Sequence, residues 1–137
     1  MNKLLTIVCL IISTTAIQAQ KTYSITSPNG TIQINVEAAA KLKWGATYQS
    51  QIIIEPSVIA LHLQTGEVAG DNVQVTSIKN ENINTTIPAL FYKKDTIRDN
   101  YAQLTLNCKG DYGIIFRAYN DGVAYRFFTK KKDSIIV

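Results

Sequence analysis

The sequence predicts an all-β fold, an antiparallel β-sandwich. About eight short runs alternate apolar with polar side chains, which is the period of a half-buried strand. Turn-forming Gly, Pro, Asn and Asp residues separate these runs, as they do in sandwiches and barrels. No stretch has the periodicity of an amphipathic helix. The chain has 137 residues, 46% hydrophobic and 18% charged, so it can form one domain with its own core.

Residues 1–19 have the layout of a secretory signal peptide. A short positive start precedes an apolar run at 4–12, and small and polar residues follow it. We expect cleavage after Ala19, which leaves 20–137 as an exported domain in the periplasm or outside a bacterial cell. The apolar run is too short to span a bilayer. Cys9 lacks the small residue expected before a lipidated cysteine, so no stable membrane anchor is expected.

The first part of the domain predicts a turn and a hairpin. The sequence Ser-Pro-Asn-Gly at 27–30 is a turn, because Pro presets φ and Asn-Gly accepts the left-handed region. Residues 32–37 then alternate strictly between apolar and polar, which predicts a half-buried strand. Residues 42–48 alternate in the same way and are the natural antiparallel partner, with the turn near 38–40.

The middle of the chain is less regular. Residues 52–54 form a short apolar run that Pro56 ends or kinks, since proline cannot donate to a strand ladder. The polar, Asn-rich stretch 79–86 predicts a loop or an irregular edge. The other expected elements are a strand at 58–63 with His62 on the face of Val58 and Ala60, a loop at 64–71, a strand at 73–78, an irregular segment at 88–99 and a strand at 101–108.

The strongest local signal lies at 113–128. Two apolar and aromatic runs flank Asn120-Asp121-Gly122, a hairpin turn in which glycine is expected to supply a positive φ. Few residues here are polar, so we expect both faces of this hairpin to be largely covered by other protein. Arg117 and Arg126 are the exceptions, and each must reach water or a carboxylate.

A family resemblance rests on four blocks in order: SPNGTIQINVE near the start, IIIEPSVIALHL in the middle, IRDNYAQLTL at 97–106 and FRAYNDGVAYRF at 116–127. Together they resemble the N-terminal domain of glycoside hydrolase family 97, over nearly all of the chain after residue 20. The resemblance implies a mutarotase-like β-sandwich. Because family members continue for several hundred residues, it also implies that the sandwich is incomplete and truncated before the catalytic barrel.

The same resemblance implies where the chemistry lies. In the family, the catalytic carboxylates and most ligands of an assisting calcium ion lie on a following (β/α)8 barrel, which hydrolyses α-glucosidic or α-galactosidic bonds. Those positions do not exist in this chain, so we assign it no catalytic, cofactor-binding or metal residue. Its expected role is structural and non-catalytic, packing in cis on the barrel and shaping the sugar site.

The residue types themselves support little chemistry. Glycoside hydrolysis usually needs two carboxylates about 5–9.5 Å apart. Of the ten carboxylates here, Asp71, Asp111 and Asp121 are next to glycine or in turns and Glu37 is on the polar face of a strand, so each is expected to be a turn or surface residue. Asp95 and Asp99 bracket Arg98 and are expected to form a surface ion pair or a network that fixes the loop. Cys108 is expected to be a small buried hydrophobe rather than a catalytic thiol. His62 has no companions at metal-ligand spacing.

The formal net charge of +4 does not predict nucleic-acid binding, because Lys130-Lys131-Lys132 is concentrated in one loop and most aromatics fall in strands. The alternative to a structural domain is a free-standing carbohydrate-binding module. Such a module needs exposed aromatics on one face. The stacking candidates are Trp44, Tyr48, Phe91, Tyr92 and Tyr101, of which Trp44 and Tyr48 are expected to pack in the core.

Overall fold

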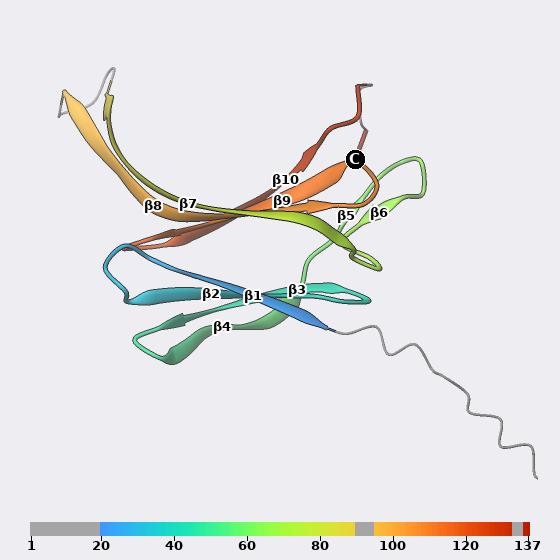
Figure 1. The fold of residues 1–137 in the computed structure, drawn as a ribbon, viewed down its shortest axis with the longest axis horizontal. Helices are drawn as coiled ribbons and strands as arrows, with labels where there is room; N and C mark the ends of the chain where they lie inside the picture. Colours follow the sequence, from blue (N-terminus) through green and yellow to red (C-terminus); the bar gives the residue numbers. More distant parts are fainter. Residues whose placement is uncertain (1–19, 90–94, 133–135) are drawn as a thin grey trace, which may run out of the picture.

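The computed structural model describes residues 20–89, 95–132 and 136–137. Two four-stranded antiparallel sheets face each other as a sandwich, which confirms the predicted fold class (Figure 1). The strand order is β1-β2-β3-β4 in the first sheet and β10-β9-β8-β7 in the second, and β5 and β6 form a separate two-stranded sheet. The expected signal peptide, 1–19, lies outside the described residues. In the described part of the chain, no helix is long and apolar enough to cross a membrane.

The first sheet follows the alternation read from the sequence. Its strands are β1 (Lys21–Thr26), β2 (Ile32–Ala38), β3 (Leu42–Tyr48) and β4 (Gln51–Val58). In β2 every second residue, from Ile32 on, is buried, and β3 is its antiparallel partner, as predicted. The turn at 27–30 is confirmed, with Gly30 at φ 77° and its N–H donating to the Ser27 carbonyl at 2.8 Å. Strand β1 was not anticipated.

Strand β4 continues through Pro56 instead of ending at it. The proline is tolerated because β4 is an edge strand, and its pairing with β3 has register shifts on either side of Ala46. Next to this irregular pairing, β4 comes close to β3 at Gly45, where a Cβ atom would lie 2.8 Å from the Ile54 carbonyl oxygen. A glycine is therefore needed at this position.

The expected strand at 58–63 is wrong. Strand β4 ends at Val58, and only β5 (Leu61–His62) is extended, paired with β6 (Val68–Ala69). His62 therefore does not share a strand face with Val58 and Ala60. The predicted loop at 64–71 is the turn of this small hairpin, together with β6.

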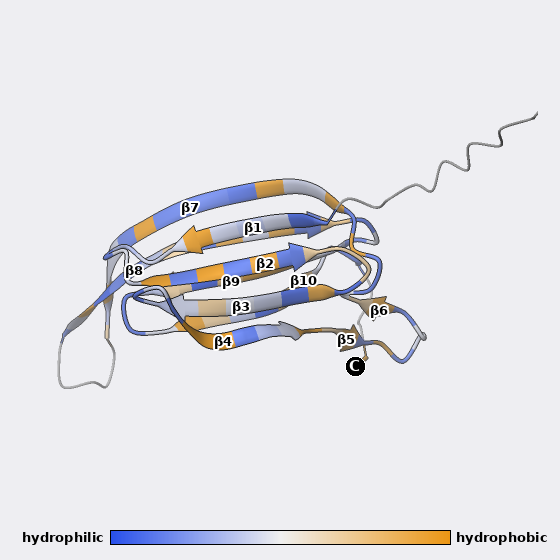
Figure 2. Cartoon of the chain, turned by 90° about the horizontal axis from the view of Figure 1, so that it is seen from below, coloured by the Kyte–Doolittle hydropathy of each residue, from blue (hydrophilic) through white to orange (hydrophobic). Residues whose placement is uncertain are grey.

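The second sheet contains the longest strands: β7 (Val75–Pro88), β8 (Thr96–Cys108), β9 (Tyr112–Tyr119) and β10 (Val123–Thr129). Residues 79–86, predicted as a loop or an irregular edge, do lie at the edge of the sheet, but as a strand that pairs with β8 throughout and not as a loop. They lack an apolar alternation because β7 is an edge strand that is exposed along most of its length, and it is largely hydrophilic in Figure 2. The irregular segment expected at 88–99 likewise contains the start of β8.

The hairpin at 113–128 is confirmed as β9 and β10, paired from Val123 opposite Ala118 to Thr129 opposite Tyr112. Two details differ from expectation. Neither Gly122 nor its two predecessors has a positive φ. The strand β10 is largely exposed rather than covered on both faces, because it is the last strand of its sheet in the described residues.

The core lies between the sheets, where β1 lies against β8 and β2 against β9. Its centre is fully buried and purely aliphatic or aromatic, with Ile34, Val36, Leu106, Ile114 and Phe116 at 0% exposure. Towards the edge formed by β10 and β4, the residues between the two sheets are less buried. Tyr125 of β10 lies 43% exposed although it pairs directly with Phe116. The sandwich is therefore closed at its centre and open along this side.

Candidate functional site

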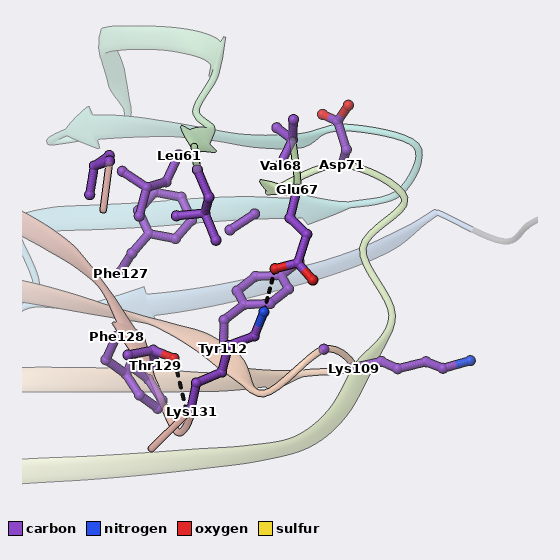
Figure 3. Close-up of a pocket in the computed structure, with 14 residues that line it drawn as sticks. Leu61, Glu67, Val68, Asp71, Lys109, Tyr112, Phe127, Phe128, Thr129 and Lys131 are labelled. Carbon is purple, nitrogen blue, oxygen red and sulfur yellow. Dashed lines mark hydrogen bonds and ion pairs between the residues drawn. The ribbon is translucent and has the colours of Figure 1, made fainter. Parts of the chain in front are cut away.

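A cavity lies at one end of the sandwich, between the β5–β6 hairpin and the ends of β9 and β10 (Figure 3). Its volume is about 490 Å³. The wall is mostly apolar, with side chains from three separate parts of the chain: Leu61, Leu63, Val68, Tyr112, Phe127, Phe128 and Val137. The cavity thus depends on how the β5–β6 hairpin is placed relative to the end of β10, since both line it.

Tyr112 fixes one wall of the cavity. Its hydroxyl accepts a hydrogen bond from the Gly70 N–H at 3.3 Å. Gly70 has φ +105°, and a Cβ atom there would lie 2.6 Å from the Ile59 carbonyl oxygen, so only glycine fits this close approach. Burial raises the pKa of the Tyr112 phenol, with a smaller opposing effect from the bond to Gly70. Tyr112 therefore stays neutral at physiological pH and positions the loop.

Charged groups occur at the rim of the cavity. Lys131 forms an ion pair with Glu67 there (Figure 3). Asp71 points away from the cavity and instead pairs with Lys41, with Nζ and Oδ2 2.7 Å apart. The lining thus does not offer two facing carboxylates for hydrolysis. The cavity therefore has a mostly apolar wall with an ion pair at its rim.

Two of the five stacking candidates, Trp44 and Tyr101, are packed against other side chains of the domain. Trp44 packs against Tyr125 and Phe116, with ring centroids 5.2 and 6.2 Å apart, which confirms its expected core packing. Tyr101 is 6% exposed. Tyr48 is 43% exposed, so the expectation that it packs in the core is wrong. Phe91 and Tyr92 lie outside the described residues.

An unpredicted network lies on the outer surface of the second sheet. Arg117 Nε donates to Gln103 Oε1 at 2.8 Å, and Gln103 Nε2 donates to Glu81 Oε2 at 3.0 Å. The Arg117 guanidinium also lies 4.4 Å from the centroid of the Tyr101 ring, and the Tyr119 ring is tilted against the same ring with centroids 5.0 Å apart. Hydrogen bonding from Lys79, assisted by Gln103, holds the pKa of Glu81 below its usual value.

Arg117 thus reaches an amide and an aromatic ring directly, whereas the sequence led us to expect water or a carboxylate. Arg126 is exposed to water, as expected. Strand register is the feature that brings the residues of this network together. Gln103 lies directly opposite both Glu81 and Arg117, but this is known only once the strands are aligned.

The remaining single candidates have structural roles. Cys108 is buried and free, and burial raises the pKa of its thiol, as expected for a small hydrophobe. Arg98 Nε donates to Asn84 Oδ1 at 3.0 Å, and within the described residues it forms no ion pair with Asp95 or Asp99. The residues in 20–89, 95–132 and 136–137 bring together no group of three or more His, Cys, Asp or Glu side chains.

These observations define a β-sandwich domain with an apolar end cavity and one open side. A family model described as "Glycosyl-hydrolase 97 N-terminal" matches residues 25–137. A retaining alpha-galactosidase of Bacteroides thetaiotaomicron is 34% identical over 132 residues, which is 96% of this chain and 20% of that protein. The chain belongs to glycoside hydrolase family 97, as its N-terminal domain.

Solved structures have the same fold. A family 97 enzyme from Pseudoalteromonas sp. strain K8, in complex with acarbose, matches with a TM-score of 0.70 and 17% identity, over 80% of this chain and 18% of that one. A beta-arabinopyranosidase matches with a TM-score of 0.68 and 20% identity, over 77% of this chain and 18% of that one. The chain thus spans about one fifth of the length of these enzymes and corresponds to their N-terminal domain, without the catalytic domain.

Proposed function

We propose that this chain is the non-catalytic N-terminal portion of an exported family 97 glycoside hydrolase. Its role is to pack on a (β/α)8 barrel in the same polypeptide and to wall the sugar site. The observation that carries this proposal is the open side of the sandwich. There Tyr125 is 43% exposed, and the apolar cavity lies beside the end of β10. Apolar surface of this kind marks a contact with other protein.

A chimera tests this role. Residues 20–137 replace the matched region of the Bacteroides thetaiotaomicron retaining alpha-galactosidase, and α-galactoside hydrolysis is measured beside the intact relative and a relative that lacks the region. We expect activity in the chimera and a large loss of kcat/KM in the deletion. A deletion enzyme with unchanged kcat/KM and thermal stability would overturn the proposal, because the domain would then neither support the barrel nor shape the site.

The open side also predicts the behaviour of the free chain. Unpaired strand edges and exposed apolar side chains favour association between copies. We expect residues 20–137 alone to have poor solubility and to elute as a broad, concentration-dependent distribution in size-exclusion chromatography. A monodisperse monomer with a cooperative melt would contradict this expectation.

Export and calcium belong to the same proposal. The layout of residues 1–19 supports export, and N-terminal sequencing of the secreted protein is expected to begin at Gln20. We propose that the calcium ion of the whole enzyme is held largely by residues of its barrel, as the family resemblance implies. Titration calorimetry of the free chain with calcium chloride is expected to give no heat of binding, and tight binding would refute the assignment.

The free-standing carbohydrate-binding module remains the alternative, with Tyr48 as its best-exposed stacking candidate in the described residues. It predicts millimolar or tighter binding of a glycan to the free chain. A glycan array without signal would eliminate it. Binding that is lost in Tyr48→Ala would favour it over the structural role.

A further inference from the structure

The outer ends of β7 and β8 form a two-stranded arm, residues 84–88 and 96–100. The pairing of β8 with β9 begins only at Tyr101 opposite Tyr119, whereas the pairing of β7 with β8 continues to Pro88 opposite Thr96. Figure 1 shows the arm curving away from the first sheet, beyond the ends of β1–β4. Two strands alone are marginally stable in water, so contact with other protein would stabilise the arm.

The arm has two different faces. Ile87 lies directly opposite Ile97 on one face, and the two side chains are 45% and 41% exposed. On the other face Arg98 donates to Asn84, within a set of polar residues completed by Thr86 and Asn100. Thr85 and Asp99 pair next to the isoleucines on the same face, so its apolar part is the Ile87–Ile97 pair. Paired apolar side chains on a strand ribbon are normally covered by other protein. The isoleucine face has no cover within the described residues.

The isoleucine face continues into the network described above. Leu104 and Leu106 of β8 point into the core, so Tyr101 and Ile97, which are odd numbers of residues away, lie on the outer surface. Tyr101 is held there beneath Arg117. Tyr101 is itself only 6% exposed, so the accessible part of this surface consists of Arg117, the two isoleucines and the polar pair Thr85 and Asp99 between them. Arginine is enriched in protein–protein contacts, in which polar residues surround an apolar centre. The hydrogen bonds among Arg117, Gln103 and Glu81 fix its base.

We propose that the isoleucine face of the arm docks on the catalytic portion of the same polypeptide, an inference that rests on the proposed function. The chain spans 20% of the length of its curated relative, so most of the enzyme is available to cover this face. Two isoleucines are a small patch compared with the roughly 800 Å² per partner that stable complexes of separate chains bury. A tethered contact needs less area, because the linker supplies a high effective concentration.

Hydrogen exchange tests the proposal in the chimera and the free chain side by side. We expect amides at 84–88 and 96–100 to exchange about tenfold or more slowly in the chimera. The double variant Ile87→Asp, Ile97→Asp is expected to remove this protection. Ile52→Asp is the matched control, because Ile52 is 59% exposed and pairs with Thr47, next to the core-facing Ala46, so it lies on the outside of the first sheet. It should leave the arm protected.

The outcomes separate this inference from the proposed function. Equal exchange of the arm in both proteins would overturn docking of the arm, even if the chimera hydrolyses α-galactosides. Protection in the free chain that grows with its concentration would also overturn it, and would assign the face to a second copy. A protected arm in a chimera without activity would retain the docking but count against the role at the sugar site.

Discussion

The two hairpins of the second sheet differ in what stabilises them. The β9–β10 hairpin is rich in apolar and aromatic residues, and β9 fills the centre of the core with Ile114 and Phe116. The β7–β8 hairpin is longer, yet its outer half is polar on one face and exposed on both. Packing stabilises the first, whereas the arm depends on pairing alone. We therefore expect substitutions in the two hairpins of the free chain to have very different effects.

The largest effect is expected at Phe116, which is fully buried between Leu104 and Tyr125. Phe116→Ala should cost about 3–5 kcal/mol of unfolding free energy, through lost burial and the cavity left behind. Urea unfolding at submicromolar concentration, followed by the fluorescence of the single tryptophan Trp44, measures this. Tyr125→Ala is the control on the neighbouring strand and should cost much less. Equal losses would mean that β10 is as well packed as β9.

A substitution at Gly113 tests how closely β9 packs against β8 and the Phe128 ring. A Cβ atom there would lie 2.6 Å from the Leu106 carbonyl oxygen and would also meet the Phe128 ring. Gly113→Ala is therefore expected to cost about 1–3 kcal/mol. Gly122→Ala in the hairpin turn is the control, since the added Cβ meets nothing within 4 Å and φ is not positive. It should change stability by less than about 0.5 kcal/mol. A large loss of stability in Gly122→Ala would instead support the positive φ that the sequence predicts for Gly122.

These hairpins also indicate which features the sequence could predict. The alternation of apolar and polar residues identified β2, β3 and β9, because the inward side chains of these strands pack in the core and are therefore apolar. The outer part of β7 was missed because an exposed edge strand needs no apolar face. The partner of Arg117 and the end cavity were missed for a different reason. They depend on register and on how β5–β6 packs, and neither property leaves a local pattern.

The core end of β8 predicts a pH dependence. Burial raises the pKa of Cys108, so the folded protein keeps the thiol proton at a pH where the unfolded chain loses it. This contribution to stability is complete below the unfolded thiol pKa of about 8.5 and is lost as pH rises towards the folded value, by at most about 1.4 kcal/mol per pH unit. Urea unfolding from pH 7 to 10 should show a steeper loss for the wild type than for Cys108→Ala. The variant retains Tyr23 and Tyr112, whose raised pKa values act at higher pH. If the stability of the wild type and of Cys108→Ala fell equally with pH, the Cys108 thiol would be hydrated in the folded protein.

The smallest effect in the free chain is expected at the arm. Ile87 and Ile97 lie opposite each other and are 45% and 41% exposed, so little burial is at stake in the free chain. Ile87→Thr keeps a β-branched side chain and should change the free energy of unfolding by no more than about 0.5 kcal/mol. The same substitution in the chimera should lower the thermal midpoint if the arm is docked there. Ile52→Thr should be neutral in both proteins. A clear loss in the free chain would mean that the arm is stabilised within this domain, and its exposed isoleucines would no longer require a partner.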